Sequence, residues 1–223
     1  DNDVSFVIDG CLFDFTPFMG LVAAIFTSLF VGSEYSDGTI RNKLVVGHSR
    51  LRIYLANLIV CSIACMLITL AYCAGIFVVG SSKGGELLTG SNIIALCLIC
   101  SFLISIAFTS IMTLFAMLNT NKAGNGVVSM ILALILLVSS SFIYQRLEEP
   151  KMSDNYVSVN EMGIPTQVEQ CPNPLYIDGT PRAILKVIND ALPSGQSMQL
   201  ADAFDSDGLA NNGIEEAPYR WMG

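Results

Sequence analysis

Charged residues are scarce in this chain, and four long stretches contain none. Only 13 % of the 223 residues are charged, about half the share expected of a soluble globular domain. The uncharged stretches cover 15–33, 53–82, 87–121 and 123–145, and each is long enough for a helix that crosses a bilayer. A single soluble domain is therefore excluded. An outer-membrane β-barrel is disfavoured, because its strands alternate apolar and polar residues, whereas these stretches are continuously apolar.

The four stretches predict an all-α integral membrane protein with four transmembrane helices. The expected spans are about 12–33, 54–79, 92–118 and 126–145. Together with the loop at 34–53 they form a membrane region over 1–147, followed by a segment of short helices and loops at 148–223. That last segment carries 12 acidic and 4 basic residues and so accounts for the whole net charge of −8. Nucleic acid is disfavoured as a partner, since it is bound through Lys and Arg.

The cations of the short loops predict how the spans are oriented. Four Lys and Arg residues lie in the loop at 34–53, and Lys122 lies in the loop before the fourth span. Short loops rich in Lys and Arg stay in the cytoplasm. We therefore expect 34–53 inside the cell and 148–223 outside it. Cys11 and Cys171 fall on the outer side, where an oxidising environment permits disulfides; the sequence leaves open whether they pair.

Two short helices are expected within the acidic segment, after a loop at 150–179. Thr180 and Pro181 have the pattern of an N-cap followed by a proline at the first helical position. Apolar residues at helical spacing follow, and residues 193–195, which are Pro-Ser-Gly, are expected to end that helix. The second helix is expected at about 197–204.

Motifs for catalysis and for nucleotide binding are missing. The only histidine is His48, and neither HExxH nor the phosphate-binding pattern GxxxxGK[ST] occurs. We therefore expect no enzymatic activity, no cofactor and no metal in this chain. Cys97 and Cys100 have the spacing of a redox or zinc pair. Their position inside an apolar stretch, with no histidine or carboxylate nearby, disfavours such a role.

Apart from Asp14, at the outer edge of the first span, the predicted spans contain no charge that would indicate a proton relay or a voltage sensor. Asp14 is interpreted as a solvated carboxylate at the interface, with contact to substrate as the alternative. Small hydroxyl residues recur instead in the third span, at Ser101, Ser105, Thr109, Ser110 and Thr113. Such residues permit tight helix packing, and they can equally line a path for a polar substrate. The sequence leaves both interpretations open.

The loop at 34–53 has an informative pattern of charged and apolar residues. Taken as one helix, it places three apolar residues on one side: Ile40, Leu44 and Leu51. Basic residues cluster beside them, which predicts a short amphipathic helix along the membrane surface. Gly38 is expected to need a positive φ where this helix starts, and Gly47 and Ser49 are candidates to break it. One interpretation is an interfacial helix whose cations only fix the topology.

The same segment resembles a known family. EYSDGTIRNKLVVGHSRLRIYLANL, at 34–58, is similar to the loop between the second and third helices of type-2 ABC transporter permeases. There, a Glu at the end of a helix precedes a run of the form GT-I-R-x-K-L, and the segment is the coupling helix that docks on the ATP-binding subunit. LPSGQSMQL, at 192–200, resembles the segment before the last helix in Firmicute members. The family usually has six helices, so the resemblance implies that this chain lacks the first and the last.

The resemblance implies a permease subunit of an ABC exporter in the cytoplasmic membrane, paired with a second permease copy or a paralogue as a dimer. ATP and Mg²⁺ would be held by a separate ABC ATP-binding subunit, and the lipid membrane is the other expected partner. The coupling role carries over to Glu34, Gly38, Thr39, Ile40, Arg41, Leu44, Gly47 and Arg50. No substrate is implied. The alternative function is a non-transporting membrane sensor or immunity protein whose outer segment binds a peptide.

Overall fold

The computed structural model describes residues 8–85, 87, 89–118, 122–152, 157–159, 165–167 and 172–203. Four of its helices are long and apolar enough to cross a membrane. They are α1 (Met19–Ser36), α3 (Arg50–Ser82), α4 (Ser91–Leu118) and α5 (Lys122–Glu148). A short 3-10 helix, η2 (Thr16–Phe18), leads into α1. The prediction of an all-α membrane protein with four transmembrane helices is confirmed.

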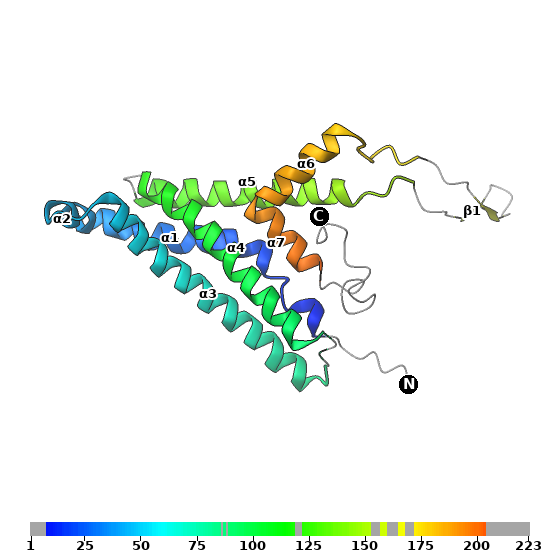
Figure 1. The fold of residues 1–223 in the computed structure, drawn as a ribbon, viewed down its shortest axis with the longest axis horizontal. Coiled ribbons are helices and arrows are strands. Elements are labelled where there is room, and N and C mark those ends of the chain that lie inside the picture. The colour runs from blue at the N-terminus through cyan, green and yellow to red at the C-terminus, as the bar shows by residue number, and fades with distance from the viewer. Residues whose placement is uncertain are drawn as a thin grey trace.

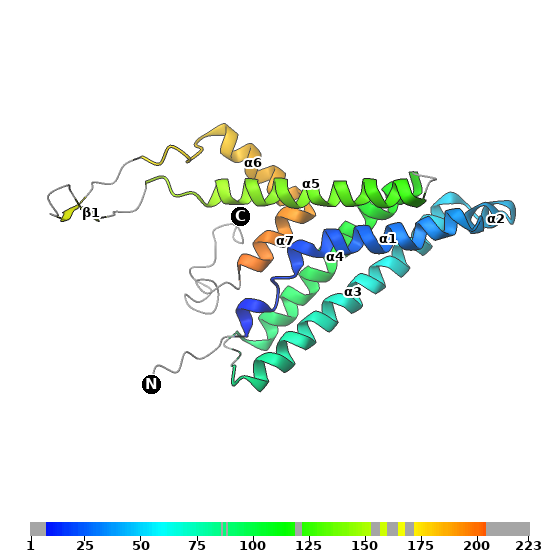
Figure 2. The same ribbon diagram turned by 180° about the vertical axis from the view of Figure 1, so that it is seen from behind.

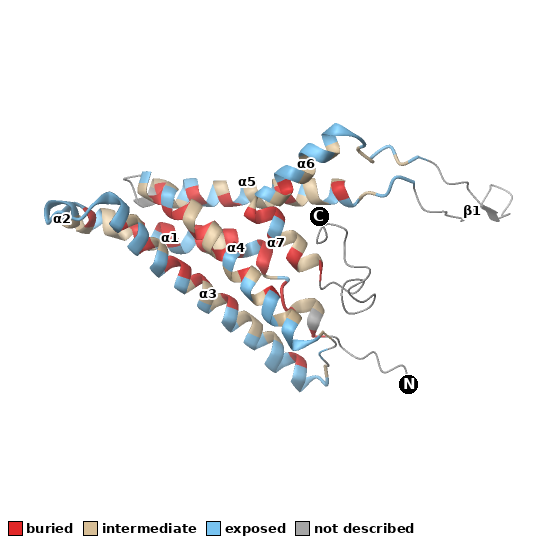
Figure 3. Cartoon of the chain, viewed as in Figure 1, coloured by how far each residue is buried: buried red, intermediate tan, exposed pale blue. Residues whose placement is uncertain are grey.

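The four long helices converge at one end of the molecule and splay apart toward the other (Figure 1, and from behind in Figure 2). α1 lies between the others and packs against α3, α4 and α5. Glycine allows the close approach to α4, since a Cβ atom on Gly20 would lie only 2.8 Å from Cε1 of Phe108. Figure 3 shows buried residues along α1 and, between exposed ones, along α3, α4 and α5.

The small hydroxyl residues of α4 lie inside the helix bundle. Ser101, Ser105 and Thr109 are fully buried. The hydroxyl of Ser105 donates to the carbonyl of Ser101 at 2.8 Å, and the hydroxyls of Thr109 and Ser62 in α3 share a 2.8 Å hydrogen bond. Interhelical hydrogen bonds of this kind help membrane helices to associate. Of the two interpretations left open by the sequence, the geometry supports tight helix packing.

Two short helices, α6 (Thr180–Ala191) and α7 (Pro193–Asp202), lie at the splayed end of the bundle (Figure 1). α7 packs against α4, α5 and η2, and thereby fills the space that opens between the long helices. Ser194 of α7 shares a 2.5 Å hydrogen bond with Ser140 of α5. One helical turn further along α5, the hydroxyl of Tyr144 donates to the carboxylate of Asp202.

The boundaries of these two helices differ from the prediction. Gly179, with a φ of 71°, takes the N-cap position of α6, so Thr180 is already helical. α7 begins at Pro193, where the sequence predicted only the end of the preceding helix. A proline in the first turn of a helix loses no hydrogen bond, and its fixed φ suits that position. Leu192 alone therefore separates the two helices.

A small antiparallel β-hairpin occurs in the segment that was expected to be loop. Its strands are β1 (Val157–Val159) and β2 (Pro165–Gln167). An isolated antiparallel β-bridge pairs Met152 with Pro172. The chain therefore returns to the end of α5 before α6 begins.

Candidate functional site

The helix α2 (Thr39–Val45) joins α1 to α3 at the end where the long helices converge (Figure 1). It has only seven residues. The prediction of one continuous amphipathic helix through Leu51 is therefore wrong, because Leu51 and Arg52 belong to α3. The break contains both predicted candidates, because Gly47 follows α2 with a positive φ and Ser49 is the N-cap of α3.

A glycine with positive φ stands at each end of α2. Gly38 occupies the N-cap position with a φ of 70°, which confirms the expectation for that residue. Gly47 follows the helix with a φ of 96°. Its amide donates to the carbonyl of Leu44 at 3.0 Å, and the amide of His48 donates to the carbonyl of Lys43 at 3.1 Å. These two bonds form a Schellman motif, so the glycines fix where α2 begins and ends.

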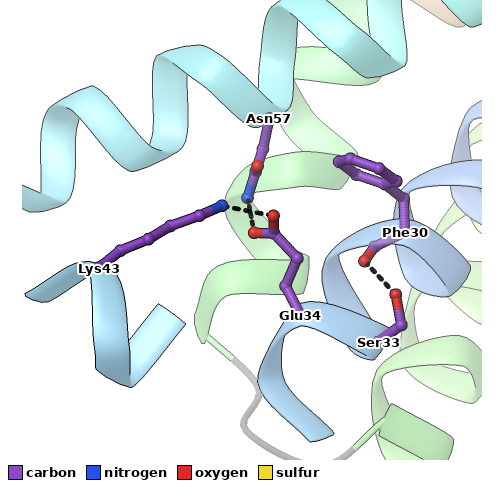
Figure 4. A network of polar contacts seen from close by, with 5 residues as sticks. All are labelled: Phe30, Ser33, Glu34, Lys43 and Asn57. Carbon is purple, nitrogen blue, oxygen red and sulfur yellow. Dashed lines mark hydrogen bonds and ion pairs between the residues drawn. The ribbon is translucent and has the colours of Figure 1, made fainter. Parts of the chain in front are cut away.

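One carboxylate connects α2 to both neighbouring transmembrane helices (Figure 4). Glu34 lies near the end of α1, and its side chain is only 15 % exposed. Nζ of Lys43 in α2 lies 2.5 Å from Glu34 Oε1. Nδ2 of Asn57 in α3 donates to Glu34 Oε2 at 3.1 Å. We call Glu34, Lys43 and Asn57 the clasp, because three elements meet there at one side chain.

The chemistry of the clasp follows from the burial of Glu34. A carboxylate withdrawn from water is costly unless it is paired and hydrogen-bonded. Lys43 supplies the opposite charge, and Asn57, which is 2 % exposed, supplies a buried amide donor. At the same level, the hydroxyl of Tyr35 donates to the carbonyl of Met117 at 2.7 Å and ties α1 to α4. Polar contacts thus join α1, α2, α3 and α4 at the converging end, beside a small apolar cluster.

α2 has one buried side and one exposed side. Ile40 is 5 % exposed and packs into a small cluster with residues of α1, α3 and α4. Arg41 is exposed, and the neighbouring Val45 and Val46 are 80 % and 79 % exposed. The helix therefore turns a cation and two apolar side chains away from the bundle.

The residues that the resemblance links to coupling all lie at this end of the bundle. Glu34 lies in α1 and Arg50 in α3, and Gly38 and Gly47 form the turns on either side of α2. The remaining four lie in α2 itself: Thr39, Ile40, Arg41 and Leu44. Of these, only Glu34 belongs to the clasp, and the sequence analysis missed Lys43 and Asn57 as its partners. Asn57 could have been recognised from the sequence, because its side-chain amide lies within an uncharged stretch and such groups need hydrogen-bond partners inside a membrane.

No metal centre is found in the part of the chain that the structure describes, where no three His, Cys, Asp or Glu side chains gather closely enough to hold an ion. Cys97 is buried in the main hydrophobic core. Cys171 lies outside the described residues, so its pairing with Cys11 stays open.

The long apolar helices and the short helix clasped between two of them define a multi-pass α-helical membrane protein. Residues 3–140 match the family described as ABC-2 family transporter protein, and the chain belongs to this family. It is thus a permease, the membrane component of an ABC transporter. Permeases of this family work with ATP-binding subunits. No curated protein and no solved structure matches the chain.

Proposed function

We propose that this chain moves a substrate out of the cell with energy from a separate ATP-binding subunit, and that α2 is the element on which that subunit acts. The observation that carries the proposal is the clasp. Through Glu34, a displacement of α2 is passed to α1, which holds the carboxylate, and to α3, which holds Asn57. Both are helices long enough to span the membrane.

The local structure of α2 supports this role. A helix of seven residues is too short to be stable alone in water. Its glycine turns, the buried Ile40 and the ion pair of Lys43 with Glu34 together hold it against the bundle. α2 therefore moves with α1 and α3 when a partner pushes on its exposed side.

The exposed side of α2 fits a protein partner with acidic or carbonyl groups. Arg41 is the exposed cation there, and a guanidinium binds such groups through several hydrogen bonds. In this proposal 34–53 lies in the cytoplasm, while 148–223 follows the membrane region at 1–147 and lies outside the cell, with α7 packed against α4 and α5. ATP and Mg²⁺ are held by the partner, and a second permease completes a dimer.

The orientation can be tested with single-cysteine variants in intact cells. Ser49→Cys reports on the turn after α2, and Asp178→Cys reports on the exposed residue before α6. A membrane-impermeant maleimide is expected to label position 178 and to label position 49 only after the cells are opened. Labelling of position 49 alone in intact cells would reverse the proposed topology.

The coupling role can be tested with the partner ATP-binding subunit, purified and reconstituted with this chain. Arg41→Glu places a like charge against an acidic partner surface, so association and ATP hydrolysis by the complex should fall by about tenfold or more. Lys43→Met removes the clasp without altering the exposed side of α2. It should leave association intact and lower hydrolysis. Lys83→Glu, at the opposite end of α3, is the matched control and should change neither.

The variants separate this function from the alternative. If Arg41→Glu leaves both association and hydrolysis at wild-type levels, α2 serves only to fix the topology. A membrane sensor whose outer segment binds a peptide would then explain the chain better than a permease driven through α2.

A further inference from the structure

A groove with a volume of about 830 Å³ lies beside α2, at the level where the transmembrane helices end. Residues of α1, α2, α3 and α4 line it. Its walls are mostly apolar, and three of the lining leucines are well exposed: Leu51 at 65 %, Leu114 at 50 % and Leu118 at 70 %. Ile40 and Ile53, which also line the groove, are buried.

The polar groups of the groove are unequally satisfied. The hydroxyl of Tyr35 donates to the carbonyl of Met117 at 2.7 Å. The hydroxyl of Tyr54 lies 2.8 Å from the hydroxyl of Ser110 and 3.1 Å from its carbonyl. Arg50 differs from both, because it is exposed and forms no ion pair with any carboxylate of the described residues. The groove therefore presents apolar walls and one uncompensated guanidinium.

We propose that this groove binds one anionic phospholipid, with an acyl chain along the leucines and the headgroup phosphate at Arg50. A phospholipid carries its charge at one end and its apolar chains at the other, as the groove requires. The level of the groove, at the ends of spans, is where headgroups meet the hydrocarbon core. Arg binds phosphate through paired hydrogen bonds.

Charge complementarity favours an anionic lipid over a zwitterionic one. Residues 34–53 contain four Lys and Arg against two acidic residues. Glu34 is already engaged by Lys43, which leaves a local excess of positive charge near the groove. Arg50 is the cation that lines the groove, and the attraction of one Arg near a membrane surface for anionic lipid corresponds to about a fivefold preference.

The proposal can be tested by tryptophan quenching at the groove itself. Trp221 is the only native tryptophan, so Leu114→Trp in a Trp221→Phe background reports on lipid in the groove. The full chain is reconstituted in bilayers that contain brominated phosphatidylglycerol or brominated phosphatidylcholine. We expect phosphatidylglycerol to quench the groove tryptophan with about fivefold higher relative affinity, and this preference should weaken at high salt.

Matched variants distinguish a built site from general surface charge. Arg50→Gln should reduce the preference to about one. Arg52→Gln removes a cation that follows two residues later in α3 and does not line the groove, and it should leave the preference unchanged. Leu103→Trp, at a residue of α4 that is 61 % exposed, reports on ordinary boundary lipid and should show no preference.

Three results would overturn the proposal. Equal quenching of the groove tryptophan by both lipids would show that the groove does not select charge. Equal losses in Arg50→Gln and Arg52→Gln would assign the preference to the membrane surface potential. Absence of quenching by either lipid would show that protein covers the groove, either a second copy or another partner.

Discussion

The two ends of the bundle hold their short helices by different means. At the converging end, α2 is tied by the clasp, and a Cβ atom built on Gly38 or Gly47 would meet nothing within 4 Å. At the splayed end, α7 is packed into the bundle. A Cβ atom on Gly195 would lie 2.0 Å from the backbone oxygen of Asn189, and Leu200 is 1 % exposed within the main core.

This difference sets a helix held by a few polar contacts and one buried side chain against a helix held by close packing, and in the proposed function the first is the part that a partner displaces. In the proposed role, the open space around Gly38 and Gly47 avoids clashes when α2 is displaced, and the clasp passes the displacement to α1 and α3. A helix such as α7, which is held by backbone contacts and buried aliphatic side chains, cannot shift slightly without clashes, because protein interiors are close-packed. The consequences of substitution should differ in the same way.

The largest effect is expected at the splayed end, from Gly195→Ala. The added methyl group must displace the Asn189 backbone at the corner between α6 and α7. We expect a loss of about 3 kcal/mol in the free energy of unfolding, measured by denaturant titration in detergent. Gly75→Ala is the control, since that glycine is helical and has open space around it; it should gain up to about 1 kcal/mol. A wild-type value for Gly195→Ala would show that α7 is not tightly packed.

A smaller loss is expected from breaking the clasp with Lys43→Met. Methionine keeps the apolar stem but leaves the Glu34 carboxylate with Asn57 as its remaining clasp partner. The unpaired charge should cost about 1–3 kcal/mol in the same titration.

The clasp also predicts a rescue. The double variant Glu34→Gln with Lys43→Met removes both charges and should recover most of that loss, because deleting both partners of an ion pair is often nearly neutral. If the two substitutions simply add, Glu34 and Lys43 are not energetically coupled.

Gly38→Ala should lower the free energy of unfolding by a smaller amount than Lys43→Met, although Gly38 is the N-cap of α2, the helix to which we assign coupling. Its φ of 70° is unfavourable for any side chain, but nothing lies within 4 Å of the added methyl group. The cost is therefore backbone strain alone, about 1–2 kcal/mol. Gly38→Asn should lose less than Gly38→Ala in the same titration, since asparagine tolerates this conformation better. Equal losses would mean that the methyl group clashes after all.

The transmembrane helices could be predicted from the sequence because each must satisfy a condition that involves only its own residues. Each helix must exclude charge over its own length to lie in hydrocarbon, and the gaps in charge show this directly. The positions where α2 begins and ends are also determined largely by local sequence, since Gly38 and Gly47 adopt a positive φ that few other residues tolerate. The continuous helix that the periodicity suggested fails at Gly47 for that reason.

The clasp and the packing of α7 depend on relations that the sequence does not display. Glu34 meets Asn57 only because α1 and α3 cross at that level, and their angle is set by packing along their whole length. Pro193 is compatible with the end of one helix or with the first turn of the next. The space between α4 and α5 decides between these possibilities, and it exists only in the assembled bundle.

The smallest effects should come from single hydroxyl groups, and they provide the most direct comparison of the two ends. Ser140→Ala removes the 2.5 Å hydrogen bond to Ser194 of α7, while Tyr35→Phe removes the 2.7 Å hydrogen bond to the Met117 carbonyl. A hydrogen bond between membrane helices contributes about 0.6 kcal/mol on average, and both variants should lose about that amount in the denaturant titration. In Ser140→Ala, the packing of Leu200 and Gly195 remains and should keep α7 in place, so cross-linking between cysteines introduced in α5 and α7 should stay at the wild-type level. If α7 detaches in this variant, polar contacts dominate at both ends, and the contrast between a movable α2 and a fixed α7 is lost.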